Sequence, residues 1–131
     1  MKIAIPDDYQ DAVRTLDCFQ KLNEQHVVII REHISDPKVL AARLQGVEAL
    51  VLIRERTPIT EALLARLPDL RLIVQTGKRA PHLDLAACTP HLGYVEKDSY
   101  ESLFGAAFDQ LLDFAAGNRM NVANPEALKH V

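Results

Sequence analysis

The chain has 131 residues, of which 48% are hydrophobic and 25% are charged, and this composition is typical of one soluble domain with a single core. Its 15 Lys and Arg against 18 Asp and Glu give a formal net charge of −3, so we expect neither nucleic acid nor a membrane as a partner. No apolar run approaches the ~18 residues that span a bilayer, and no basic leader precedes residues 3–5, so the sequence predicts a cytoplasmic protein.

Short β-branched runs alternate along the chain with stretches of helical spacing. Because few polar residues interrupt them, the runs suit strands buried on both faces of a parallel sheet; they cover residues 2–5, 26–30, 48–53 and 70–74. Helices are predicted over residues 9–22, 36–45 and 60–67. The second of these has Asp36 as N-cap, Pro37 at its first position and Gly46 beyond its end. This order predicts an α/β fold, a doubly wound parallel sheet in three layers.

The C-terminal third is predicted to form one long amphipathic helix. A single apolar stripe, which includes Tyr100, Phe104 and Phe108, runs over residues 99–116, and Gly117 is placed to end the helix. The tail over residues 121–126 is too short and too limited by Pro125 to be more than a strap along the surface.

Cations follow the third and fourth predicted strands. In open α/β sheets ligands bind outside the carboxyl ends of the strands. Arg54, Arg56, Lys78 and Arg79 follow such ends, and Gly77 lets the backbone approach an anion closely. The sequence therefore predicts a site for a small carboxylate. Loops at strand ends can also be polar simply because they are exposed to solvent. For each single residue this alternative to ligand binding stays open.

Nucleotides and metal ions fit the sequence less well than a small carboxylate does. The five glycines are too far apart for a dinucleotide fingerprint or a phosphate loop. The five histidines have no metal-ligand spacing, so no metal site is expected. Cys18 and Cys88 are interpreted as buried free thiols. A phospho-receiver domain would need an aspartate after the third strand, where this chain has Arg54. His91 stands between Pro90 and Gly93, and a histidine held in this way can exchange protons near neutral pH.

Several of these segments together resemble the NAD-dependent D-isomer-specific 2-hydroxyacid dehydrogenases. The matching segments span essentially the whole chain; they are Ile53-Arg54-Glu55-Arg56-Thr57, Gln75-Thr76-Gly77, His82-Leu83-Asp84-Leu85-Ala86-Ala87-Cys88, Thr89-Pro90-His91-Leu92-Gly93-Tyr94-Val95 and Phe104-Gly105 to Asn124-Pro125-Glu126. By this resemblance Arg54 and the backbone around Gly77 and Lys78 match positions that hold the substrate carboxylate, and His91 is the counterpart of the catalytic histidine.

The resemblance also implies that a domain is missing. In intact members the NAD-binding domain is inserted into the substrate domain, whereas here the two halves meet near residues 88–90. The glycine-rich loop and the catalytic Arg and Glu would lie in the absent part, so no cofactor binding is expected of this chain. We interpret residues 1–131 as one flavodoxin-like substrate-binding domain of about five strands, excised from its cofactor domain rather than shortened by a natural deletion, and without turnover of its own.

Two other functions remain open for this chain, and the missing domain leads to two structural expectations. The chain could instead be a stand-alone module that senses a small 2-oxo or 2-hydroxy acid, or a fragment that folds and binds nothing. We expect residues 92–95 to supply the fifth strand, which would put His91 at the sheet end opposite Arg54. We also expect a homodimer, formed by domain swapping through the shortened connection, because loss of the cofactor domain would leave apolar surface near the C-terminal helix uncovered.

Overall fold

The structure is a computed structural model that describes residues 1–76, 81–84 and 97–118. Its centre is a parallel sheet with the strand order β2-β1-β3-β4. The strands are β1 (Lys2–Ile5), β2 (His26–Ile29), β3 (Ala49–Ile53) and β4 (Leu72–Thr76). Among the described residues the sheet has these four strands. The predicted α/β class and the parallel sheet are confirmed, and the expected fifth strand over residues 92–95 lies outside the described residues.

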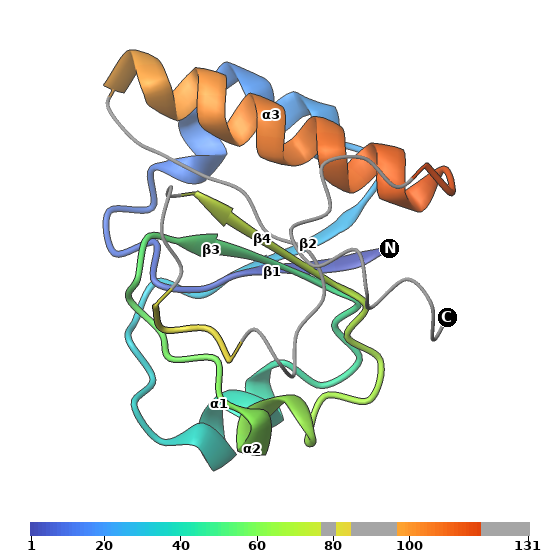
Figure 1. Ribbon diagram of the computed structural model, residues 1–131. Helices are drawn as coiled ribbons and strands as arrows, with labels where there is room; N and C mark the ends of the chain where they lie inside the picture. The colour runs from blue at the N-terminus through green and yellow to red at the C-terminus, as the bar shows by residue number, and fades with distance from the viewer. Residues whose placement is uncertain (77–80, 85–96, 119–131) are drawn as a thin grey trace.

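Helices cover both faces of the sheet, as Figure 1 shows. On one face lie α1 (Pro37–Arg43) and α2 (Glu61–Leu64). On the other lie α3 (Lys97–Ala115) and two short 3-10 helices, η1 (Val13–Thr15) and η2 (Asp17–Leu22). Alternate strand residues serve the two faces, since Leu50 packs toward α1 and α2 while Val51 packs toward α3. The uninterrupted apolar runs follow from this burial on both sides.

Helix α1 forms as the sequence predicts, because its local signals agree. The Asp36 carboxylate accepts a hydrogen bond from the Lys38 N–H at 2.8 Å, Pro37 occupies the first turn, and Gly46 follows the helix with a φ of 70°. A positive φ is a conformation that glycine adopts without strain. The predicted N-cap, first residue and stop signal are therefore confirmed.

Two predicted elements near the carboxyl edge differ from the structure. Residues 9–22 were expected to form one helix, but they form η1 and η2, separated by the extended Leu16. The fourth strand was expected over residues 70–74 but runs to Thr76, whose side chain is buried and donates to the Leu52 carbonyl at 2.9 Å. Gln75 and Thr76 thus belong to the strand rather than to the loop that follows it.

Helix α3 packs on the sheet of its own chain. Phe104, Phe108 and Leu111 have no exposed surface and join the core formed with β1, β3 and β4. The Glu101 carboxylate accepts hydrogen bonds from the N–H groups of Asp17 and Cys18 at 2.5 and 2.9 Å, and so fixes α3 to η2. The apolar stripe of α3 is therefore covered by the sheet of its own chain. Oligomeric state stays a prediction.

Cys18 is a buried free thiol, as expected, whereas Cys88 lies outside the described residues. The same holds for the junction near residues 88–90 and for the tail over residues 121–126. No helix in the described part of the chain is long and apolar enough to cross a membrane.

Candidate small-acid site at the carboxyl edge of the sheet

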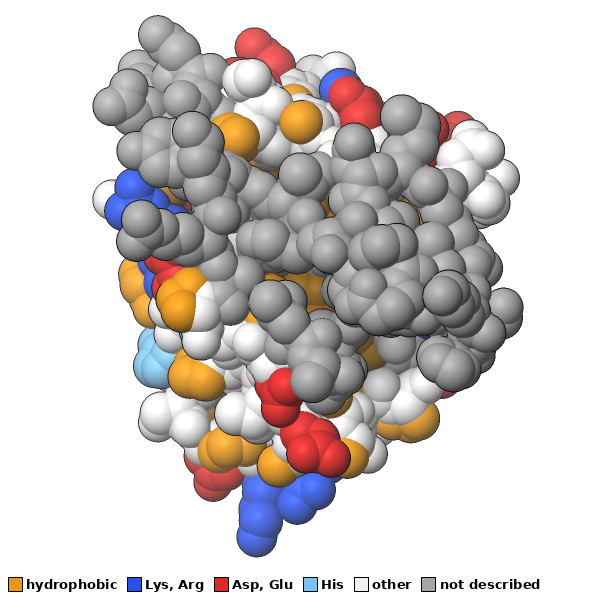
Figure 2. Space-filling view, in the orientation of Figure 1, with side chains coloured by type: hydrophobic (Ala, Val, Ile, Leu, Met, Phe, Trp, Pro, Cys, Tyr) orange, Lys and Arg blue, Asp and Glu red, His pale blue; other side chains and the backbone are white. Residues whose placement is uncertain are grey.

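The four strands end at one edge of the sheet, on the left in Figure 1, where the arrowheads of β3 and β4 lie. Asp7 follows β1, His33 lies in the loop after β2, and Arg54 directly follows β3. On this side of the space-filling view, side chains of Lys or Arg, of acidic residues and of histidine are visible (Figure 2). This edge is where parallel α/β sheets bind ligands.

Strained backbone is concentrated at the same edge. Within the described residues the non-glycine positions with positive φ are Asp7 at 64°, Asp11 at 52° and Arg54 at 56°. A residue with a side chain rarely adopts this left-handed conformation, and such positions persist only where the surrounding structure holds them. All three lie in the loops that follow β1 and β3. Strain of this kind clusters at functional sites, which supports the assignment of the site to this edge.

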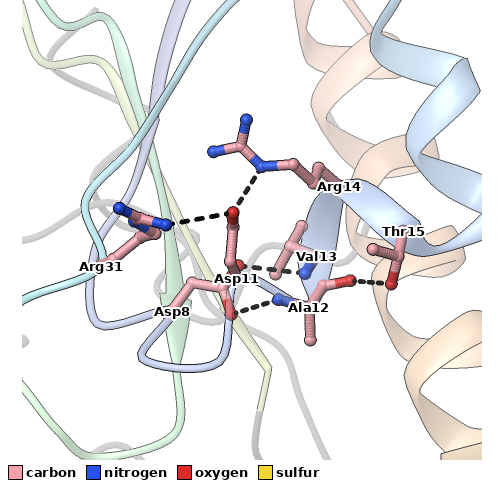
Figure 3. A network of polar contacts seen from close by, with 7 residues as sticks. All are labelled: Asp8, Asp11, Ala12, Val13, Arg14, Thr15 and Arg31. Carbon is pink, nitrogen blue, oxygen red and sulfur yellow. Dashed lines mark hydrogen bonds and ion pairs between the residues drawn. The ribbon is translucent and has the colours of Figure 1, made fainter.

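The loop after β1 is held by a network of polar contacts, shown in Figure 3. The buried Asp8 carboxylate accepts hydrogen bonds from the N–H groups of Ala12 and Val13, both at 3.0 Å. Asp11 binds the side chains of Arg14 at 2.5 Å and Arg31 at 3.4 Å. The Asp8 bonds satisfy the N–H groups at the start of η1. Together with the Asp11 ion pairs they fix the loop in its strained path.

Asp7 is the most highly connected of the loop residues. Its carboxylate accepts a hydrogen bond from the Thr57 hydroxyl, lies 2.9 Å from His33 Nδ1 and 3.3 Å from the Tyr9 hydroxyl. Its carbonyl oxygen accepts a hydrogen bond from Arg56 Nη1 at 2.6 Å, and the Arg56 guanidinium stacks 4.6 Å from the centre of the Tyr9 ring. One buried aspartate therefore ties together the loops after β1, β2 and β3.

Arg54 differs from its neighbours because its side chain is exposed and has no ion-pair partner among the described residues. Its backbone N–H donates to the Thr76 hydroxyl at 3.4 Å, which links the loop after β3 to the end of β4. The backbone is thus fixed while the guanidinium remains available. A planar guanidinium with free N–H groups is the side chain best suited to bind a carboxylate with two parallel hydrogen bonds.

Comparison with known proteins shows which family this chain belongs to. Residues 7–92 match the family model described as D-isomer specific 2-hydroxyacid dehydrogenase, catalytic domain. The chain belongs to this family. A comparison with curated proteins finds no match.

Solved structures of dehydrogenases share the fold. An oxidoreductase from Ralstonia solanacearum described as a D-3-phosphoglycerate dehydrogenase is 49% identical over 70% of this chain and 29% of its own, with a TM-score of 0.67. A phosphoglycerate oxidoreductase from Vibrio cholerae is 51% identical over 77% of this chain and 29% of its own, with a TM-score of 0.65. The matched region is thus under a third of these dehydrogenases' length.

A more distant similarity bears on the fold alone. A protein from a Polaromonas species, described as a D-isomer specific 2-hydroxyacid dehydrogenase, is 21% identical over 66% of this chain and 26% of its own, with a TM-score of 0.53.

Of the family residues predicted from the sequence, Arg54 lies at the carboxyl edge. Gly77, Lys78 and His91 lie outside the described residues. Asp7, His33 and Thr57, which the structure brings together, were not predicted as site residues. The signal that could have found them is the parallel register, which brings the ends of β1, β2 and β3 side by side.

The loop after β1 does not fit the dinucleotide that the resemblance to this family implies. A pyrophosphate would need free N–H groups at the turn and helix that follow a strand. After β1 the N–H groups of Ala12 and Val13 are already taken by the Asp8 carboxylate, and Asp7 adds a second negative charge at the turn. In the same described part of the chain, no group of three or more His, Cys, Asp or Glu side chains could hold a metal ion.

Proposed function

We propose that this chain is the substrate-binding domain of a D-2-hydroxyacid dehydrogenase, and that it binds a small 2-hydroxy or 2-oxo acid without turning it over. The observation that carries the proposal is Arg54, an exposed arginine without an ion-pair partner among the described residues, on a strained backbone at the ligand-binding edge of the sheet. By the resemblance to the family, the backbone around Gly77 and Lys78 would hold the same carboxylate.

The absence of turnover is part of the proposal. Interconversion of a 2-hydroxy and a 2-oxo acid requires a hydride donor or acceptor, which the nicotinamide supplies in intact members of the family. The loop after β1 has carboxylates where a pyrophosphate would bind. His91 is the counterpart of the family's catalytic histidine, but without a hydride partner it has no reaction to assist.

Ligand titration followed by NMR tests the binding half of the proposal. One charge-assisted site on an open edge should give a dissociation constant on the order of 1–10 mM for a small 2-oxo acid such as pyruvate. Arg54→Gln should weaken binding about tenfold or more, since hydrogen bonds to charged groups contribute about 1.5–3 kcal/mol. Arg66→Gln is the matched control, because Arg66 is an exposed arginine that follows α2, away from the carboxyl edge.

Two results would contradict the proposal. Equal weakening by the Arg54 and Arg66 substitutions would show that the acid binds by charge alone. Saturable enhancement of NADH fluorescence at micromolar concentration, or NADH oxidation with a 2-oxo acid above a blank, would show that the chain has a working cofactor site.

A further inference from the structure

The turn that carries Arg54 is attached to a neighbouring strand on each side. Strand β3 lies between β1 and β4 in the sheet (Figure 1). On the β1 side, Arg56 donates to the Asp7 carbonyl at 2.6 Å, and the Thr57 hydroxyl donates to the Asp7 carboxylate. On the β4 side, the Arg54 N–H donates to the Thr76 hydroxyl at 3.4 Å. The contact with β4 is thus the one that acts on the backbone of Arg54 itself.

Thr76 is the last residue of β4, and its hydroxyl group bonds to the end of β3. The residue is only 1% exposed, and in the register of the two strands it lies opposite Ile53, the last residue of β3. The hydroxyl donates its hydrogen to the Leu52 carbonyl at 2.9 Å, so its oxygen is left to accept from the Arg54 N–H. One buried hydroxyl group therefore bridges the residues before and after Ile53.

The core does not require a hydroxyl group at this position. The first three residues of β4 are Leu72, Ile73 and Val74, and valine would fill nearly the same space as Thr76 at a buried strand position. A hydroxyl group that is taken out of water costs free energy unless its hydrogen bonds are made. A threonine here is therefore explained by what its hydroxyl group does for the turn after β3 rather than by packing.

The backbone of Arg54 is in a conformation that needs such support. Its φ is 56°, in the left-handed region that a residue with a side chain rarely adopts. Extended backbone would be the relaxed alternative for a residue that directly follows a strand. Because φ and ψ fix the direction in which a side chain leaves the backbone, that change would point the guanidinium elsewhere. The hydrogen bond from the Arg54 N–H to Thr76 is made in the left-handed conformation and so favours it.

We propose that Thr76 is a positioning residue for the acid site: its hydroxyl group holds the backbone of Arg54 in the left-handed conformation, and this directs the guanidinium toward the carboxylate of the ligand. The inference rests on the proposed function, because it takes Arg54 to bind that carboxylate. Thr76 does not touch the ligand itself. Its buried hydroxyl group acts only through Arg54.

Titration with pyruvate followed by NMR tests this role in two variants of Thr76. Thr76→Val keeps the branched shape and removes the hydroxyl group, so the dissociation constant should rise about fivefold, the change that one neutral hydrogen bond typically makes. Thr76→Ser keeps the hydroxyl group and should bind within a factor of two of the wild type. Thr60→Val is the matched control, because the Thr60 hydroxyl accepts from the Leu63 N–H at 3.3 Å at the start of α2. The control loses a hydrogen bond of the same kind and should bind pyruvate as the wild type does.

A second readout does not depend on a ligand. In the left-handed conformation the amide hydrogen lies close to the α hydrogen of the same residue, so Arg54 should give a strong nuclear Overhauser effect between these two atoms. The signal should be retained in Thr76→Ser and in Thr60→Val, and it should weaken in Thr76→Val as residue 54 relaxes toward extended backbone. A role of Thr76 in the core alone would lower the free energy of unfolding without changing this signal.

The outcomes separate this inference from the proposed function. If the wild type does not bind pyruvate, both fall together. If Thr76→Val binds pyruvate as the wild type does while Arg54→Gln binds it more weakly, Arg54 keeps its role and the positioning by Thr76 is overturned. Equal weakening by Thr76→Val and Thr60→Val overturns it as well. If Thr76→Val does not fold, Thr76→Cys takes its place, since a thiol is only a weak acceptor, and binding equal to that of the wild type again overturns the inference.

Discussion

Replacing Phe108 by alanine tests whether α3 completes the core of its own chain. The side chain has no exposed surface and its ring lies 5.6 Å from that of Phe104. Truncation of a buried phenylalanine to alanine costs about 3–5 kcal/mol, which combines the lost transfer of apolar surface with the cavity left behind. Since domains are stable by only about 5–15 kcal/mol, Phe108→Ala should lose a large part of the free energy of unfolding.

Urea denaturation followed by circular dichroism measures this loss, and Phe114→Ala is the matched control. Phe114 is on the same helix but is only partly buried, beneath the Arg71 guanidinium at 5.6 Å, so its truncation should cost about 1–2 kcal/mol. The reasoning is refuted if both variants lose the same amount. It is also refuted if the wild-type midpoint rises with protein concentration, because α3 would then pack on another copy of the chain. Light scattering of the wild type distinguishes a monomer, which gives one species of 14.6 kDa, from the expected homodimer, which gives a species of twice that mass.

Three further outcomes follow from contacts on the same side of the sheet. Asp8→Ala should lower the free energy of unfolding by about 1–3 kcal/mol, measured by urea denaturation, because it leaves the buried Val13 N–H without its acceptor. The hydrogen bond from the Cys18 N–H is the largest cause that lowers the pKa of Glu101 below its usual 4.5. The ionised Glu101 carboxylate therefore stabilises the fold above pH 4.5, and this contribution is lost as the pH falls through the lowered pKa of the folded state. In that pH range the urea midpoint should decline more steeply in the wild type than in Glu101→Gln. Burial is the largest cause, and the nearby Glu101 the next, that raise the pKa of the Cys18 thiol to about 12. Peptide mapping after treatment with iodoacetamide at pH 8 should therefore find Cys18 modified only in the unfolded chain.

Local signals predicted those elements whose formation depends on local contacts. Helix α1 follows from the sequence because Asp36 and Pro37 at its start and Gly46 after its end act within a few residues of the helix. Residues 9–22 have helical spacing of apolar side chains, but that spacing does not show how the backbone enters the segment. Two structural facts decided the outcome: Asp11 is in the left-handed conformation, and Leu16 is extended between η1 and η2.

The candidate site was predictable as a place but not as a set of contacts. Arg54 follows from the rule that ligands bind at the carboxyl ends of parallel strands. The contact between Asp7 and His33 joins residues 26 positions apart and depends on the register of β1 with β2. The hydrogen bond between Thr57 and Asp7 spans 50 positions. No spacing within one segment encodes such contacts, because they arise only when the sheet has assembled.

Helix α3 enters the core as a separate piece of chain, packed on β4 and joined to η2 by hydrogen bonds between residues 84 and 88 positions apart. Between Thr76 and Lys97, Leu83 is buried in the core and pairs with Ile59, and the connections on either side of it must still let the ends of this stretch meet. The entropy of closing a loop grows only with the logarithm of its length, about 0.6 kcal/mol for each doubling. A long insertion at this point, even one that folds by itself, costs the core little as long as its ends lie close together. The same arithmetic lets such an insertion be removed while the two halves of the core still find each other.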